Sequence, residues 1–197
     1  MINPENPLRV GVLGSTRGTA LQGVLNALRL NQLPGVELAL VVADKPNAGI
    51  LDRAAQHDID NLFLNPKGLE REMFDAEVTS AFQEADVELI LMIGYMRIVS
   101  REFVEDWRGR LLNVHPSLLP AFAGLMNRQV HEAVLAAGVP ETGCTVHQVT
   151  EDVDAGPIVL QKRCRILEGD TVESLKDRVQ ALEQQAFVEV LQNWPRK

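Results

Sequence analysis

The spacing of apolar residues changes several times along the chain, and each change marks a predicted helix or strand. Residues 8–13 are almost all apolar and run into a Gly, Ser and Thr segment at 14–19, which predicts a buried strand that ends in a turn. Leu21, Val24 and Leu25 then recur at helical spacing. The amino end is therefore predicted to be a strand–loop–helix unit.

The same alternation continues to the end of the chain. Further strands are predicted at 36–43, 62–64, 87–93, 111–114, 145–149 and 158–166. Further helices are predicted at 50–57, 69–85, 100–107, 127–137 and 170–190. Continuous apolar strands separated by helices predict an α/β fold, a mostly parallel twisted sheet flanked by helices on both faces. We expect this Rossmann-like sheet to have an antiparallel portion in its carboxyl-terminal half.

The last predicted helix begins at Asp170, and Glu173 follows three residues later, which is the spacing of a capping box. In that helix Gln180 and Glu183 are also three residues apart, so they share one face.

Composition narrows the class of protein. A chain of 197 residues with 46% hydrophobic and 23% charged residues predicts one globular domain, 1–197. No apolar run approaches the roughly 20 residues that cross a bilayer, and the first residues lack the pattern of an export signal. We therefore expect a cytoplasmic protein that does not bind membranes, with residues 1–8 as a flexible arm.

Charge and cysteine content exclude further classes. The net charge of −8 argues against a surface that binds nucleic acid, although local groups can still hold a small phosphorylated molecule. Cys144 and Cys164 lack the spacing of a zinc or redox motif, so reduced thiols and no metal are expected.

The loop at 14–19 is the first candidate site. It connects a strand to a helix, and the free N–H groups at a helix start attract phosphate. The loop is neither a Walker loop nor the dinucleotide fingerprint. A phosphate site and a plain turn are equally consistent with it.

Asn113 and His115 form the second candidate, at the end of a buried strand followed by Pro116. Side chains alternate along a strand, so these two lie on the same side. A satisfied core histidine is the usual explanation of a single imidazole, but the strand-end position favours a functional site.

The acidic turn at 150–157 is the third candidate. Glu151 and Asp152 are expected to be solvated. Asp154 precedes Ala155, Gly156 and Pro157, whose tight backbone could direct its carboxylate inward.

Together these motifs resemble one family. Asn-Val-His-Pro-Ser-Leu-Leu-Pro at 113–120, Thr-Val-His at 145–147 and Asp-Ala-Gly-Pro-Ile at 154–158 are similar to the formyltetrahydrofolate-dependent transferases. The resemblance runs from about residue 8 to 194 and is strongest to members that formylate glycinamide ribonucleotide in purine biosynthesis. It implies 10-formyltetrahydrofolate as co-substrate and Asn113, His115 and Asp154 as catalytic residues.

The resemblance also implies a role for each catalytic residue. Asn113 and protonated His115 would stabilise the oxyanion of a tetrahedral intermediate. Asp154 would orient His115 and assist removal of a proton from the amine. Neither a metal nor a covalent nucleophile is required.

Two substrate sites are implied as well. Ribonucleotide contacts carry over to Gly18, Thr19, Ala20, Arg71, Gln180 and Glu183. Folate contacts carry over to Met96, Arg97, Ile98, Val99, Asn113, Glu151 and Asp154. Core packing is the simpler explanation for at least one of the three apolar residues at 96–99. The chain departs from the family pattern at 15–20 and is longer at 124–131, so that loop carries no assignment.

Alternative functions remain open at this point. A formyltetrahydrofolate hydrolase has the same catalytic residue types, but normally carries an additional amino-terminal domain. A methionyl-tRNA formyltransferase would require a further domain and a basic face. A non-catalytic nucleotide-binding module need not bring Asn113, His115 and Asp154 together. We expect small-molecule partners and a monomer or weak homodimer.

Overall fold

The computed structural model describes residues 6–195. Its strands are β1 (Leu8–Gly14), β2 (Val36–Ala43), β3 (Asn61–Phe63), β4 (Leu89–Met92), β5 (Leu111–His115), β6 (Glu141–Gln148) and β7 (Ile158–Arg165). Its helices are α1 (Leu21–Arg29), α2 (Gly49–Ala55), α3 (Arg71–Glu84), α4 (Arg101–Asp106), α5 (Arg128–Ala137) and α6 (Val172–Gln192).

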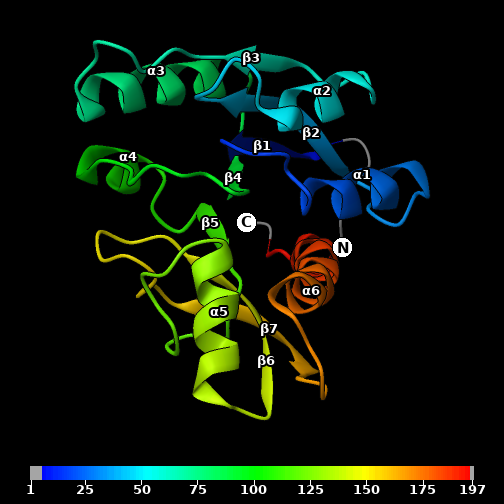
Figure 1. Ribbon diagram of the computed structural model, residues 1–197. Helices are drawn as coiled ribbons and strands as arrows, with labels where there is room; N and C mark the ends of the chain where they lie inside the picture. The colour runs from blue at the N-terminus through cyan, green and yellow to red at the C-terminus, as the bar shows by residue number, and fades with distance from the viewer. Residues whose placement is uncertain (1–5, 196–197) are drawn as a thin grey trace.

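The strands form one seven-stranded sheet in the order β3-β2-β1-β4-β5-β6-β7 (Figure 1). Pairing is parallel from β3 to β5 and antiparallel from β5 to β7. The predicted fold class is therefore confirmed. The strand order reverses between β1 and β4, and such a point opens a crevice beyond the carboxyl ends of the strands.

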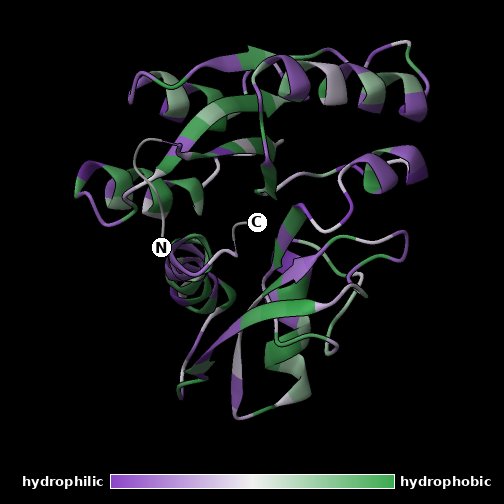
Figure 2. Ribbon diagram, turned by 180° about the vertical axis from the view of Figure 1, so that it is seen from behind, coloured by the Kyte–Doolittle hydropathy of each residue, from purple (hydrophilic) through white to green (hydrophobic). Residues whose placement is uncertain are grey.

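Helices cover both faces of the sheet, and the core has two parts. On one face α1, α2, α5 and α6 pack on apolar residues of β1 and β4. On the other face α3 contributes Phe74 and Phe82, and Trp107 follows directly after α4. The rings of Phe82 and Trp107 pack edge to face at 6.0 Å. In Figure 2 the central strands are mostly green, which marks hydrophobic residues, whereas the helices carry both green hydrophobic and purple hydrophilic residues. The buried strands leave only their ends for polar groups.

Two local predictions need correction. Residues 1–5 of the predicted arm lie outside the described residues, but Leu8 is not part of an arm. It is the first residue of β1 and only 5% exposed, because its side chain packs in the core.

The predicted capping box is wrong by one residue. Thr171, not Asp170, caps α6, since its hydroxyl accepts the N–H of Ser174 while the Ser174 hydroxyl accepts the N–H of Thr171. Asp170 instead binds Arg178 through two hydrogen bonds of 2.6 and 2.8 Å.

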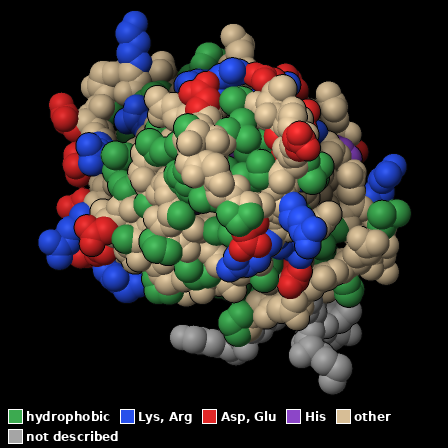
Figure 3. Space-filling model, turned by 60° about the horizontal axis from the view of Figure 1, so that its bottom comes forward, with side chains coloured by type: hydrophobic (Ala, Val, Ile, Leu, Met, Phe, Trp, Pro, Cys, Tyr) green, Lys and Arg blue, Asp and Glu red, His purple; other side chains and the backbone are tan. Residues whose placement is uncertain are grey.

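The surface carries charges of both signs. On the face drawn in Figure 3, Lys and Arg side chains lie interspersed with Asp and Glu around apolar groups, without a continuous basic patch among the coloured residues. Within residues 6–195 no helix is both long and apolar enough to cross a bilayer. Cys144 and Cys164 are both free thiols.

Candidate active site

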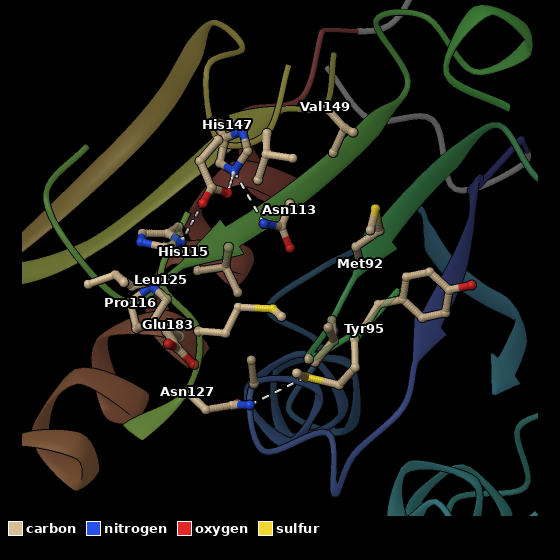
Figure 4. Close-up of a pocket in the computed structure, with 18 of the residues that line it drawn as sticks. Met92, Tyr95, Asn113, His115, Pro116, Leu125, Asn127, His147, Val149 and Glu183 are labelled. Atoms are coloured by element: carbon tan, nitrogen blue, oxygen red, sulfur yellow. Dashed lines mark hydrogen bonds and ion pairs between the residues drawn. The ribbon is translucent and has the colours of Figure 1, made fainter. Parts of the chain in front are cut away.

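A pocket of about 450 Å³ lies beyond the carboxyl ends of β1, β4 and β5 (Figure 4). Its walls come from the loop after β1, the segment after β4, the end of β5, the loop before α5, the turn before β7 and one face of α6. The pocket thus occupies the crevice that the reversal of strand order creates.

The loop after β1 is tied to the segment after β4. The Ser15 N–H donates to the Gly94 carbonyl at 3.2 Å, and the Ser15 hydroxyl accepts the Met96 N–H at 2.9 Å. Gly18 has φ +63°, and a Cβ there would lie 2.4 Å from the Ile50 side chain, so this position requires glycine. The two loops therefore form one fixed wall.

Of the predicted phosphate contacts in this loop, Thr19 and Ala20 line the pocket, whereas Gly18 is buried beside Ile50. No side chain caps the start of α1. The N–H groups of Leu21 and Gln22 already donate to the carbonyls of Gly18 and Thr19, so an anion in the pocket would be held by the loop N–H groups that precede them.

Asp154 and His115 meet on the opposite side of the pocket. Asp154 Oδ2 lies 3.2 Å from His115 Nδ1 and accepts the Gly124 N–H at 2.9 Å. Both side chains are nearly enclosed, with 5% of His115 and 9% of Asp154 exposed. Two residues from distant segments therefore form a shielded acid–base pair.

The backbone of the turn explains how Asp154 reaches this position. Asp154 has φ +55°, a conformation that is uncommon for a residue with a side chain and recurs at functional sites. Gly156 packs directly on β6, where a Cβ would lie 1.8 Å from the Gln148 carbonyl oxygen. The close approach of this glycine holds Asp154 over the end of β5.

The hydrogen-bond partners of His115 indicate which of its two ring nitrogens carries hydrogen. The Phe122 carbonyl lies 3.1 Å from Nε2 and can only accept, so Nε2 carries hydrogen. The nitrogen that gains or loses a proton is thus Nδ1, beside Asp154. Burial lowers the pKa of His115, and the negative charge of Asp154 opposes that effect.

Asp154 is held as a carboxylate. Burial raises its pKa, but the contact with His147, the hydrogen bond from the Gly124 N–H and the charge of His115 outweigh burial, so the pKa lies below its ordinary value. An ionised Asp154 next to Nδ1 can orient the imidazole and receive a proton.

Asn113 lies next to this pair, as the period of the strand predicts. Its Nδ2 is 3.2 Å from Nε2 of His147, which in turn is 3.5 Å from Asp154 Oδ1. The structure therefore brings Asn113, His115 and Asp154 together and adds His147, which belongs to the Thr-Val-His motif at 145–147 but has no role predicted from the sequence.

One face of α6 closes the pocket. Gln180 and Glu183 line it, as does Lys176, for which the described residues provide no hydrogen-bond or ion-pair partner. Burial raises the pKa of Glu183 to about 8, and the positive charge of Lys176 partly opposes this. His131 also lines the pocket, with Nδ1 buried and unpartnered. Neither Lys176 nor His131 could be recognised from helical spacing alone.

The four residues at 96–99 line the pocket on the side of β4. Ile98 is 59% exposed, while Val99 packs against the core, so core packing explains only one of these two side chains. The Arg97 guanidinium lies 5.1 Å from the centre of the Phe74 ring. Asp75, buried in α3, accepts the N–H of Ser100 at 2.5 Å and fixes the end of the segment.

Two predicted contacts lie elsewhere or are already paired. Arg71 is exposed at the start of α3 and is not among the residues that line the pocket. Glu151 lines the rim, but its carboxylate forms an ion pair with Arg108 at 2.9 Å. Glu151 therefore lies at the pocket, but its carboxylate is already paired with Arg108. Arg71 does not lie at the pocket.

Comparison with known proteins identifies relatives of this chain. Residues 8–191 match the family model described as formyl transferase. The phosphoribosylglycinamide formyltransferase of Bacillus subtilis (strain 168) is 34% identical over 93% of this chain and 92% of that protein. The trifunctional purine biosynthetic protein adenosine-3 of Drosophila pseudoobscura pseudoobscura is 44% identical over 93% of this chain. The chain spans only 13–18% of the length of the trifunctional relatives.

Solved structures agree with the sequence matches. The crystal structure of glycinamide ribonucleotide transformylase 1 from Symbiobacterium toebii has a TM-score of 0.89 and 41% identity, covering 94% of this chain and 86% of that one. A formyltetrahydrofolate deformylase from Pseudomonas syringae is 23% identical with a TM-score of 0.84, which shows a shared fold alone. The chain belongs to the formyl transferase family.

Proposed function

We propose that the protein transfers the formyl group of 10-formyltetrahydrofolate to the amine of glycinamide ribonucleotide. One observation carries the proposal: Asn113, His115 and Asp154 converge on a pocket whose opposite wall contains an uncapped helix start. A phosphate-bearing amine and a formyl donor can then meet between the two walls. The names of the relatives of similar length support this choice of substrates.

The chemistry follows from the enclosed polar groups. The amine attacks the formyl carbon, and the carbonyl oxygen becomes negatively charged. Asn113 Nδ2–H is the donor that would bind this oxygen, and protonated His115, whose Nδ1–H faces Asp154, would add a positive charge beside it. When the bond from carbon to N10 of the folate breaks, the amine loses a proton and N10 gains one. Asp154, ionised beside Nδ1, is the acceptor that can relay this proton.

The ribonucleotide would occupy the side of the pocket formed by α1 and α6. The backbone at Thr19 and Ala20 would bind the phosphate, with Gly18 shaping the turn. Gln180 and Glu183 would contact the ribose and the glycine amine. We do not place Arg71 in this site, because it does not line the pocket.

The folate would lie along residues 96–99 and the turn at 151–154. Backbone groups of Met96 and Arg97 follow directly on the fixed wall at Ser15, which favours a rigid pterin site. Ile98 and Val153, 59% and 55% exposed, provide apolar surface at the rim.

A coupled assay tests the proposal. Purified protein is incubated with 10-formyltetrahydrofolate, with glycinamide ribonucleotide or with water as the only acceptor, and tetrahydrofolate release is recorded. We expect release only with the ribonucleotide, together with formylated product. Release at the same rate in water would identify a hydrolase, and no release with either acceptor would favour a non-catalytic module. The His115→Ala variant is the matched control and should lose the signal.

A further inference from the structure

His147 stands directly opposite Asn113 in the sheet. The two residues are paired in the antiparallel register of β5 and β6, which places their side chains on the same face about 5 Å apart at Cβ. On the other edge of β6 the pairing with β7 shifts register between Val146 and His147. Such a bulge increases the local twist and redirects side chains beside active sites. The fold thus directs a second imidazole at the amide.

The neighbours of His147 determine where its proton lies. Its Nδ1 is 3.0 Å from the Gln148 carbonyl oxygen, which can only accept, so Nδ1 carries hydrogen. In the neutral imidazole Nε2 is then an acceptor, and Asn113 Nδ2 donates to it at 3.2 Å. The amide nitrogen of Asn113 therefore faces His147 and its oxygen faces away, as Figure 4 shows.

The other arrangements of this pair are unfavourable. A flipped amide would place Oδ1 of Asn113 against the lone pair of Nε2. A protonated His147 would donate to Asp154 Oδ1, 3.5 Å away, and would leave Asn113 Nδ2 without its acceptor. With His147 only 2% exposed, water does not replace the missing partner. Neutral His147 therefore selects a single orientation of the amide.

We propose that His147 is a positioning residue that holds the Asn113 amide with its second N–H free for the reacting oxygen. The proposal rests on the proposed formyl transfer for its catalytic meaning. Without the acceptor at Nε2 the amide can rotate and present its carbonyl oxygen, which repels a developing oxyanion. His147 acts through Asn113 and does not itself touch the reacting atoms.

The test compares two replacements of similar size. His147→Gln keeps an acceptor oxygen for the amide, whereas His147→Leu keeps volume and removes the acceptor. We expect His147→Leu to lower kcat about tenfold, less than the roughly 10²–10³ lost when an oxyanion donor itself is removed. KM for both substrates should stay within about twofold, and His147→Gln should recover most of kcat.

A double-mutant cycle separates this role from general packing. In the Asn113→Ala background His147→Leu should cause no further loss of kcat, because the residue through which it acts is gone. Additive losses, or equal losses in the Gln and Leu variants, would overturn the proposal. Thermal unfolding of every variant controls for a folding defect.

A spectroscopic measurement keeps the inference testable apart from activity. With ¹⁵N-labelled asparagine, the side-chain NH₂ signals of Asn113, assigned by their loss in Asn113→Ala, should shift in His147→Leu and be largely retained in His147→Gln. Signals unchanged in His147→Leu would contradict the proposal even in an active enzyme. If the wild-type protein transfers no formyl group, the proposed function fails while this measurement still reports on the contact.

Discussion

The two halves of the sheet contribute to the pocket in different ways. The parallel half, β1 to β4, supplies the loop after β1, the start of α1 and the largely apolar segment after β4. The antiparallel half, β5 to β7 with its connecting turn, supplies side chains: Asn113, His115, His147 and Asp154. Binding groups fixed by chain geometry tolerate sequence change, whereas groups that must carry a proton or a charge do not.

This contrast accounts for the departure of the phosphate loop from the family pattern. Residues 15–20 can differ as long as Gly18 keeps its left-handed turn against Ile50 and the helix start stays uncapped. The side-chain cluster has no such freedom, because each imidazole nitrogen and carboxylate oxygen in it is partnered by another member or by a neighbouring backbone group. Variants in the two halves should therefore differ in both the size and the kind of their effects.

The largest effect is expected for Asp154→Asn. Asparagine retains the size and can still accept the Gly124 N–H, but it has no charge beside His115 and cannot receive a proton. We expect kcat to fall by about 10²–10⁴ with little change in ribonucleotide KM. Steady-state kinetics with both substrates measure this.

Asp86→Asn is the matched control for that variant. Asp86 also has a left-handed backbone, φ +51°, and is exposed outside the pocket lining. Its kcat should equal that of the wild type. An Asp154→Asn enzyme of comparable activity would remove the carboxylate from the mechanism.

A smaller effect is expected for Gly156→Ala when compared with Gly143→Ala. In both variants the new Cβ would lie 1.8 Å from a backbone carbonyl oxygen, of Gln148 and Lys162 respectively. Each should lower the free energy of unfolding by about 1–3 kcal/mol. Only Gly156→Ala moves the turn that carries Asp154, so it alone should lower kcat, by about 10- to 100-fold.

Urea unfolding and kinetics of the folded variants measure the two quantities separately. Equal kcat values for the two variants would show that the position of Asp154 tolerates movement of its turn. The two halves of the sheet would then differ in the chemistry of their side chains and not in how precisely those side chains must be positioned.

A pH-dependent effect on stability is expected for Glu183→Gln, a change on the face of α6 that lines the pocket. The pKa of Glu183 rises from 4.5 to about 8 in the folded protein, so between these pH values the folded state holds a proton that the unfolded state releases. The free energy of unfolding therefore falls as pH increases through this window. The variant lacks this loss, so its Tm relative to wild type should rise from pH 5 to pH 8, reaching about 5 °C.

Thermal melts between pH 5 and pH 9 test this, with Glu77→Gln, an exposed position on α3, as control. A Tm difference that is constant across this range would indicate that Glu183 titrates normally. Ribonucleotide KM should rise in Glu183→Gln regardless of that result, since the carboxyl group proposed to contact the substrate is lost.

The smallest effect is expected for Thr19→Ala. Only the hydroxyl is lost, while the backbone N–H groups at the start of α1 remain. Ribonucleotide KM should rise about two- to fivefold with kcat unchanged, the loss of about one hydrogen bond. A loss of kcat similar to that of Gly156→Ala would remove the distinction between the two halves.

Much of the fold can be predicted from the sequence, because the spacing of apolar residues within a short segment already indicates a helix or a buried strand. The strands at 36–43 and 158–165 and the helix after the first loop are evident from apolar spacing. The start of β6 was placed four residues late, at Thr145 instead of Glu141, because Gly143 reads as a strand breaker. The backbone of β7 approaches this glycine so closely that no side chain would fit, and one sequence segment does not reveal that contact.

The site was predictable to a different extent. Asn113 and His115 follow from alternation in one strand, and the turn sequence drew attention to Asp154. His147 lies in the Thr-Val-His motif, but the sequence predicts no role for it, because only the register between β5 and β6 places it opposite Asn113. Lys176 was missed for a related reason: helical spacing identifies its face but not which pocket that face meets.

The position of β5 between the two halves has one more consequence. It pairs in parallel with β4 and antiparallel with β6, so both neighbours fix its register. A slip of one residue would turn Asn113 and His115 together to the opposite face and put Val114 in their place. A molecule with β5 in the wrong register would therefore be inactive, and one with β5 in the correct register would be fully active. The specific activity of a refolded sample would then report the fraction of molecules in which β5 has the correct register.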